Sequence, residues 1–346
     1  MQVAVYSPKQ REIWSRLIDA SANGTLFHRQ EFLDYHPAGR FIWQHLVFGN
    51  PGEPTAVMPG AIHVDSRGNR SYRSPTGATL GGPVFRPRLG LAGTEELVAA
   101  LAAYAEEAGF AAITLGTVPS IYWSAPDDTL EFALANAGFS STPQLMYYVR
   151  LRPAVSSPAT VSPDIAASSD ITQLIPASKR ADFRKALQQG LELKRAETAD
   201  EVSAFYEVVR LNKAAHDATP VHSLEEIVRL KETLGDRLVI LCAHKDGRVV
   251  AGVSCVAATP RVWYTQYIAD RPDSRGVEAT RFVLLGALKE LIDRGAEMLD
   301  LGPSVQLPIQ RRGGALFKES LGGIGCERRE WTLVLPPMST AAKSPG

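Results

Sequence analysis

The feature that most constrains the fold is an arrangement of helices and strands that occurs twice along the chain. A helix over 95–109 ends at a glycine and leads into the buried strand 110–115, and a helix over 277–294 does the same for the strand 297–301. Apolar residues at helical spacing, followed by a C-terminal glycine, predict both helices. An antiparallel hairpin precedes this unit in each half, and a shorter helix and a last strand follow it. Two copies of one α/β module explain the length better than two unrelated domains.

The hairpins are predicted from alternating apolar residues around turn sequences. The first has strands over 44–48 and 55–64, and the second has strands over 238–244 and 249–258 around Asp246-Gly247. A further strand over 262–269 leads to the second long helix.

The expected boundaries follow from a change in composition near the middle of the chain. Residues 153–170 contain three prolines, many serines and no basic residue, which is typical of a linker or a long surface crossover. We therefore expect a first module over 1–152, a linker over 153–176, a second module over 177–335 and a disordered tail over 336–346.

Charge and cysteine usage narrow the class of function. The 37 basic and 37 acidic residues balance, so any site for a polyanion must be a local patch. Three cysteines without CxxC spacing indicate a reduced compartment, and seven histidines without an HxxxH or HExxH pair give a metal site little support. The sequence shows neither a signal peptide nor an apolar run of membrane-spanning length, which predicts a cytoplasmic protein.

The stretch 298–323 contains the expected catalytic residues. We expect Gly302-Pro303 to break a short buried strand that carries Asp300, and a polar loop then leads to a short helix with Phe317 and Lys318. An acidic group at a strand end and a lysine beyond a glycine turn are predicted to be catalytic, with Phe317 holding the backbone. Two simpler interpretations remain open: Asp300 caps a turn, or Lys318 is a surface lysine paired with Glu319 or Glu327.

The expected substrate-binding residues lie in both halves. The segment from Lys179 to Arg195 contains six basic residues and only two acidic ones, which predicts a phosphate-binding helix. The alternative is a solvated helix face, which is the more common explanation of such a charge run. The glycine- and proline-rich segment 72–83 is either an anion cradle or a connecting loop. The predicted binding residues are Arg73, Ser74, Tyr122, Lys179, Arg180, Arg184, His216, His222, Tyr267, Arg311 and Arg312.

Short motifs along almost the whole chain carry a resemblance to a known family. They are Gly24-Thr25-Leu26-Phe27-His28, Ser74-Pro75-Thr76-Gly77-Ala78 with Gly81-Gly82, Lys179-Arg180, HDATPVH over 216–222, Ala251-Gly252-Val253, Leu299-Asp300-Leu301-Gly302 and Phe317-Lys318. With the repeated element order, the chain resembles the Fem family of aminoacyl-tRNA-dependent transferases, which have a GNAT-like acyltransferase fold. The resemblance implies an α/β (α+β) fold of two tandem GNAT-like modules, with mixed sheets flanked by helices.

The resemblance also implies an activity. An aminoacyl group would move from aminoacyl-tRNA to an amine of a peptidoglycan precursor or a natural product, and an amide bond would form. We expect no metal, no cofactor and no membrane insertion, and a monomer or weak dimer. The alternatives are an acyl-CoA-dependent N-acyltransferase of the GNAT type and a non-catalytic binding module.

One departure from a plain GNAT enzyme favours the first activity. Coenzyme-A-dependent members hold the pyrophosphate with an R-x-x-G-x-G/A turn at a helix N-terminus. The matching segment here, RPDSRGVEA over 271–279, lacks the second glycine and places Glu278 where it would repel a phosphate. We therefore expect a donor other than acetyl-CoA.

Overall fold

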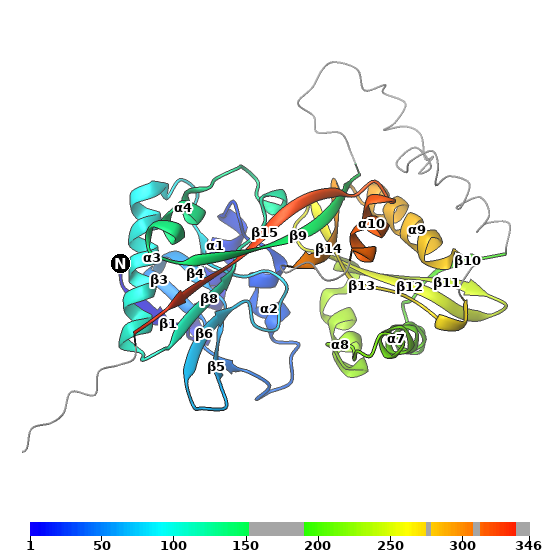
Figure 1. Cartoon of the computed structure of the whole chain (residues 1–346), viewed down its shortest axis with the longest axis horizontal. Coiled ribbons are helices and arrows are strands. Elements are labelled where there is room, and N and C mark those ends of the chain that lie inside the picture. Colours follow the sequence, from blue (N-terminus) through cyan, green and yellow to red (C-terminus); the bar gives the residue numbers. More distant parts are fainter. Residues whose placement is uncertain (152–189, 275–277, 307–311, 337–346) are drawn as a thin grey trace, which may run out of the picture. The chain divides into compact units, whose positions relative to one another are not determined.

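The structure is a computed structural model that describes residues 1–151, 190–274, 278–306 and 312–336 (Figure 1). The predicted linker, the basic residues Lys179, Arg180 and Arg184, and nearly all of the predicted tail lie outside the described residues.

The chain divides into two compact units. The first comprises Met1–Gln144 with the described residues from Arg328 onward, and the second comprises the described residues of Leu145–Glu327. Both passages between the units occur inside strands, β9 (Ser140–Arg150) and β15 (Ile324–Val334). The second half of β15 therefore belongs to the first unit, although it is the last strand of the sequence.

The first unit contains two sheets. Its other strands are β1 (Val3–Val5), β2 (Ile42–Trp43), β3 (Leu46–Asn50), β4 (Glu53–Met58), β5 (Ala61–Val64), β6 (Arg70–Ser74), β7 (Val84–Phe85) and β8 (Ala112–Gly116). Its helices are η1 (Pro8–Gln10), α1 (Arg11–Ala20), η2 (Leu26–His28), α2 (Gln30–Leu33), α3 (Gly90–Glu107), η3 (Ser120–Tyr122) and α4 (Thr129–Asn136). One sheet has the order β1-β3-β4-β7, and the other runs β15-β8-β6-β5-β2.

The predicted strand over 55–64 is wrong as a single strand. β4 ends at Met58 and β5 begins at Ala61, and the two strands belong to different sheets. Pro59 and Gly60 lie between them, a residue pair that lacks one backbone donor and permits a sharp change of direction.

The second unit is a sheet with helices on both faces. Its other strands are β10 (Glu192–Arg195), β11 (Leu238–Lys245), β12 (Arg248–Ala257), β13 (Val262–Asp270) and β14 (Met298–Gln306), in that order across the sheet. Its helices are α7 (Ala199–Ala214), α8 (Leu224–Leu234), η5 (Gly235–Arg237), η6 (Pro272–Ser274), α9 (Ala279–Asp293) and α10 (Gly313–Glu319). Figure 1 shows α9 on one face of β11–β13, and α7 with α8 on the other.

Each unit contains the same connection, in which a strand is followed by a long helix and then by a strand that pairs in parallel with the first. β6 pairs in parallel with β8 across α3, and β13 pairs in parallel with β14 across α9. The remaining described pairings within these sheets are antiparallel, including the predicted hairpins β3–β4 and β11–β12. Asp246 and Gly247 both have positive φ, 52° and 75°, which is the two-residue turn that a twisted hairpin favours. The α/β fold of two GNAT-like modules is therefore confirmed.

The core of the second unit defines the two faces of its sheet. Alternate residues of β12, β13 and β14 (Val253, Cys255, Trp263, Leu299 and Leu301) join the apolar side of α9 in one buried cluster. The intervening residues therefore face α7 and α8, because successive side chains of a strand point to opposite faces. Gly252 confirms the assignment, since a Cβ there would collide with Phe205 of α7.

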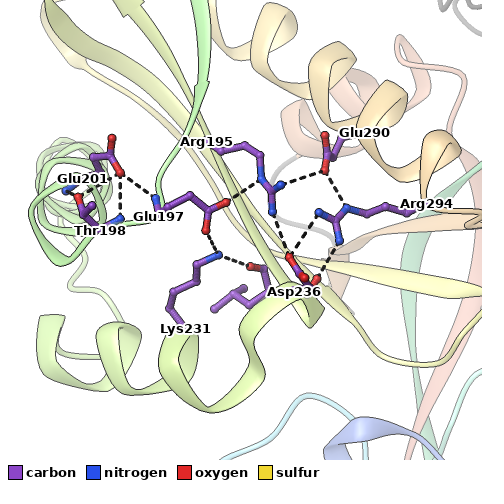
Figure 2. Close-up of polar contacts among 9 residues, drawn as sticks. Arg195, Glu197, Thr198, Glu201, Lys231, Asp236, Glu290 and Arg294 are labelled. Carbon is purple, nitrogen blue, oxygen red and sulfur yellow. Dashed lines mark hydrogen bonds and ion pairs between the residues drawn. The ribbon is translucent and has the colours of Figure 1, made fainter.

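An ion-pair network joins β10, α8, η5 and α9 at one end of this sheet (Figure 2). Arg195 lies at its centre, with a nitrogen 2.9 Å from Glu197 and others 3.5 Å from Asp236 and 3.8 Å from Glu290. Lys231 and Arg294 extend the network to Glu197 and to Glu290, each at 2.7–2.8 Å. Since linked charges hold one another in place, the network fixes the ends of these elements.

Candidate functional site

The candidate site begins where β13 and β14 stop pairing. Their described register runs from Val262↔Met298 to Tyr264↔Asp300, while β13 continues to Asp270 and β14 to Gln306. Asp300 and Tyr264 both alternate with core residues, so both side chains lie on the face opposite α9.

The prediction that Gly302-Pro303 breaks the strand is wrong, because β14 extends through both residues. Gly302 has φ +77°, a left-handed backbone conformation inside the strand that glycine adopts without strain. Pro303 lies beyond the described pairing with β13, so its missing N–H costs no bond to that strand.

Helix α10 presents Lys318 to this part of β14. The Lys318 ammonium donates to the carbonyl oxygens of Gly302, at 2.8 Å, and Pro303, at 3.1 Å. These two bonds use two of its three N–H donors, and among the described residues no carboxylate pairs with it. Glu319, a proposed surface partner, instead accepts a hydrogen bond of 2.7 Å from the Tyr147 hydroxyl.

The backbone of Lys318 is fixed by the end of α10. Gly323 N–H donates to the Lys318 carbonyl at 3.0 Å, Gly322 N–H donates to the Glu319 carbonyl at 2.9 Å, and Gly322 has φ +82°. This pair of bonds is a Schellman cap. The glycines therefore end the helix, whereas Phe317 packs against the core cluster and holds α10 on the sheet.

Burial sets the chemistry of Lys318. Removal from water lowers the pKa of its ammonium from 10.5 to about 8, and the negative charge of Asp300 opposes this shift. At pH 7 the group is still roughly nine-tenths protonated. It is a poorly hydrated cation with one donor left for a reacting group.

Asp300 has the contacts of a turn cap, which was the simpler of the two interpretations considered for it. It is only 2% exposed, and its Oδ1 accepts a 2.6 Å hydrogen bond from Gly302 N–H, as a turn-capping aspartate would. Thr265 Oγ1 donates to the Asp300 carbonyl at 2.9 Å and fixes its backbone. The same carboxylate favours the charged form of Lys318.

The structure adds Tyr264, which the sequence interpretation missed. A Cβ placed on Gly302 would lie 3.6 Å from the Tyr264 hydroxyl and 3.9 Å from Lys318 Nζ. A phenol and an ammonium therefore converge on one short piece of backbone.

Two further predicted residues of the second unit lie together. Tyr267 is buried, and its hydroxyl lies 2.8 Å from His222 Nδ1. His216 is exposed just beyond α7 and is not part of this contact. Arg312 is exposed at the N-cap of α10, and Arg311 lies outside the described residues.

The predicted binding residues of the first unit have other partners. Ser74 is fully buried, where its hydroxyl donates to the Pro59 carbonyl and accepts from Gly82 N–H at 2.9 Å. Arg73 lies 3.2 Å from Glu330 in an ion pair, and Tyr122 is 3% exposed. The hydrogen bonds of Ser74 therefore join the start of segment 72–83 to its end at Gly82 and to Pro59.

Glu278 occupies the expected N-cap of α9. Its carboxylate lies 2.8 Å from Arg281, so part of its charge is offset. Within the described ranges, no cluster of three or more His, Cys, Asp or Glu side chains could hold a metal ion. None of the described helices combines the length and apolar character that a membrane crossing requires.

Comparison with known proteins gives the class to which this arrangement corresponds. Residues 177–315 match the family described as "Acetyltransferase (GNAT) domain". That segment contains β10 to β14 with Asp300 and Gly302, and it ends three residues before Lys318. The search of curated proteins found no match.

Solved structures share the fold over nearly the whole chain. The structure of FemX has a TM-score of 0.70 at 12% identity, covering 97% of this chain and 98% of that one. A tandem GNAT protein from the clavulanic acid biosynthesis pathway has a TM-score of 0.56 at 14% identity, with coverage of 97% and 99%. L-PGS from Bacillus licheniformis has a TM-score of 0.55 at 10% identity, with coverage of 94% and 91%. The chain therefore shares the GNAT-like fold of these structures, FemX among them, and residues 177–315 match a GNAT acetyltransferase domain.

Proposed function

We propose that the protein moves an aminoacyl group from aminoacyl-tRNA to an amine acceptor, with Lys318 as the group that stabilises the transition state. The observation that carries the proposal is the half-buried ammonium of Lys318, anchored on the Gly302 and Pro303 carbonyls with one donor left over. The likeness to FemX in fold supports it.

The chemistry of the transfer explains why such a cation is useful. The acceptor nitrogen attacks the ester carbonyl carbon, and the carbonyl electron pair moves onto oxygen. When that pair returns, the bond to the ribose oxygen breaks, and the proton lost by the amine ends on that oxygen. Negative charge therefore appears first on the carbonyl oxygen and then on the ribose oxygen. A fixed ammonium in a poorly hydrated site stabilises both charges more than it stabilises the uncharged reactants.

Asp300 would act through Lys318. Its carboxylate raises the pKa of the ammonium against the effect of burial, which keeps the charge in place near neutral pH. Tyr264 would donate from the same neighbourhood, since its hydroxyl and Lys318 Nζ both lie within 4 Å of the Cβ position of Gly302. The acceptor would be an amine of a peptidoglycan precursor or a natural product, and the tRNA phosphates would meet Arg312 with Lys179, Arg180, Arg184 and Arg311.

A second candidate is acyl transfer from coenzyme A. The match of 177–315 to an acetyltransferase domain favours it. Against it stands the sequence of the first turn of α9, where Glu278 takes the N-cap in a left-handed conformation (φ 52°). A carboxylate at that point offsets the positive end of the helix that a pyrophosphate would use.

Binding of the two donors separates the candidates. Purified protein is titrated with charged tRNA, with the same tRNA after deacylation, and with acetyl-CoA. We expect binding of tRNA that weakens steeply with salt, is tighter for the charged form, and exceeds that of acetyl-CoA. A micromolar dissociation constant for acetyl-CoA, about −8 kcal/mol, together with no preference for charged tRNA, would replace this proposal by the second candidate.

A further inference from the structure

Helix α10, which carries Lys318, has little apolar anchorage of its own. Of its seven residues, all of them described, only Ala315 is buried, Phe317 is partly buried, and Leu316 is 63% exposed. A helix this short does not hold its shape by itself in water. Helix α9, which lies beside it in Figure 1, is buried along one side in the core of the second unit. The position of Lys318 therefore depends on the contacts that hold α10 to its neighbours.

A hydrogen bond from α9 reaches the turn that ends α10. Arg281, in the first turn of α9, donates from Nη2 to Ser320 Oγ at 3.3 Å. The same hydroxyl donates to the Phe317 carbonyl at 2.7 Å, so it is used both as an acceptor and as a donor. Phe317 directly precedes Lys318, and Ser320 follows it by two residues. The two bonds thus hold the backbone on both sides of Lys318.

Arg281 is itself held by Glu278. Its side chain is 13% exposed, and Nη1 lies 2.8 Å from the Glu278 carboxylate. Glu278 has φ 52°, a left-handed conformation that is strained for a residue with a side chain, and such strain persists where contacts hold a residue in place. With one arm on Glu278 and the other on Ser320, the planar guanidinium is fixed in orientation.

The contacts of Lys318 require accurate placement of α10. Its Nζ donates to two successive carbonyls, Gly302 at 2.8 Å and Pro303 at 3.1 Å. A displacement of about 1 Å would stretch these bonds beyond hydrogen-bonding distance. Misplacing a group of the reaction by that amount costs roughly 10²-fold in turnover. Contacts that prevent such a displacement are therefore worth as much to the reaction as the ammonium's own partners.

We propose that Arg281 is a positioning residue for the transfer, which acts through Ser320 to hold the last turn of α10 so that the Lys318 ammonium stays on the Gly302 and Pro303 carbonyls. The inference rests on the role proposed for Lys318. Arg281 itself touches neither substrate, and Glu278 keeps it directed at Ser320.

Three variants and a control test the role of this contact in turnover. Ser320→Ala removes the acceptor without a change of charge, and Arg281→Met removes the donor. Each should reduce kcat by roughly 10–10²-fold with KM nearly unchanged. The double variant should be no slower than the slower single variant, because both changes break one contact. Arg294→Met is the matched control, since Arg294 pairs with Glu290 at the other end of α9, and it should leave kcat unchanged.

The titration of Lys318 separates positioning from a general loss of stability, and it needs no turnover. Burial lowers the pKa of Lys318 to about 8, so a displaced α10 that lets water reach Nζ should raise that pKa toward 10.5. Carbon-13 NMR of labelled lysine should show a rise to about 9 or higher in Ser320→Ala and no change in Arg294→Met. Asp300 and Tyr264, the ionisable groups near Nζ, are the same in both proteins.

The outcomes distinguish this inference from the proposed function. Multiplied losses in the double variant, or a Ser320→Ala protein that transfers at the wild-type rate with the pKa of Lys318 still near 8, would overturn the inference alone. A raised pKa in Ser320→Ala, in a protein that transfers from neither donor, would support the hold of Arg281 on α10 and overturn the proposed function.

Discussion

Replacing Lys318 by methionine should make the protein both slower and more stable. Methionine fills a similar volume without charge, so the change removes the ammonium and keeps the packing of α10. Loss of one electrostatic donor of this kind costs roughly 10²–10³ in turnover, about 3–4 kcal/mol of transition-state stabilisation. If Lys318 served only to stabilise the fold, its replacement by methionine would lower the free energy of unfolding instead of raising it.

The gain in stability follows from the pKa of Lys318. Burial lowers it from 10.5 to about 8, so keeping the group charged in the folded protein at pH 7 costs about 3 kcal/mol. Methionine avoids this cost but loses two hydrogen bonds to the carbonyls of Gly302 and Pro303, worth about 1–2 kcal/mol together. The variant should therefore be more stable at pH 7 by about 1–2 kcal/mol, which raises Tm by about 2–6 °C.

The pH dependence gives a second check on the same variant. The folded-state pKa lies below the unfolded one, so between about 8 and 10.5 the unfolded chain binds more protons and wild-type stability rises with pH. The penalty is complete below pH 8 and is gone above 10.5. The advantage of Lys318→Met should shrink across that window.

Turnover and urea denaturation on the same samples, from pH 7 to 10.5, measure these effects. Lys289→Met is the matched control, because Lys289 is a lysine of α9 that is 48% exposed and paired with Asp293. It should change stability by less than about 0.5 kcal/mol and leave turnover unchanged. A Lys318→Met protein that is less stable than wild type at pH 7, or that keeps normal turnover, would refute the reasoning.

Three further outcomes are expected. Wild-type turnover should fall as pH rises through about 8, and Lys318→Arg should remove that fall, because a guanidinium stays charged; the same fall in both proteins would place the titrating group elsewhere. Asp300→Asn should move the fall to lower pH, since the neutral amide still accepts from Gly302 N–H but no longer favours the ammonium; an unmoved pH profile would remove Asp300 from the mechanism. Arg195→Met should lower the free energy of unfolding, measured by urea titration, by about 1 kcal/mol at low salt and by less at 1 M salt, and it should leave turnover unchanged. Equal losses at both salt concentrations would mean that Arg195 stabilises the fold by packing and not by charge.

Much of the fold could be predicted because its signals are local. Helix α8 has a serine N-cap and a glycine after its last turn, and the β11–β12 hairpin has Asp246-Gly247 at its turn, so sequence neighbours alone define them. The order of elements in the two modules follows from the same signals. The second half of β15 belongs to the first unit, where Trp331 pairs with Leu115 of β8. No pattern in the sequence around β15 predicts that it pairs with β8.

The candidate site was predicted only in part, for the same physical reason. Phe317 and Lys318 stand out because a glycine pair lies on each side of them in the sequence. The carbonyls that anchor Lys318 belong to a strand 15 and 16 residues earlier, where the backbone conformation depends on the positive φ of Gly302. Tyr264 was missed because its approach to Gly302 depends on the pairing of β13 with β14, which a single strand does not reveal. Ser74 was expected to bind substrate, and its hydroxyl is used inside the first unit.

Product formation from the two donors tests the central claim most directly. Protein is incubated with an amine-bearing peptidoglycan precursor and either radiolabelled aminoacyl-tRNA or radiolabelled acetyl-CoA, and new amide product is counted. The account predicts product from aminoacyl-tRNA that drops roughly 10²–10³-fold in Lys318→Met, and none above background from acetyl-CoA. Efficient acetyl transfer, or aminoacyl transfer that Lys318→Met leaves intact, would contradict it.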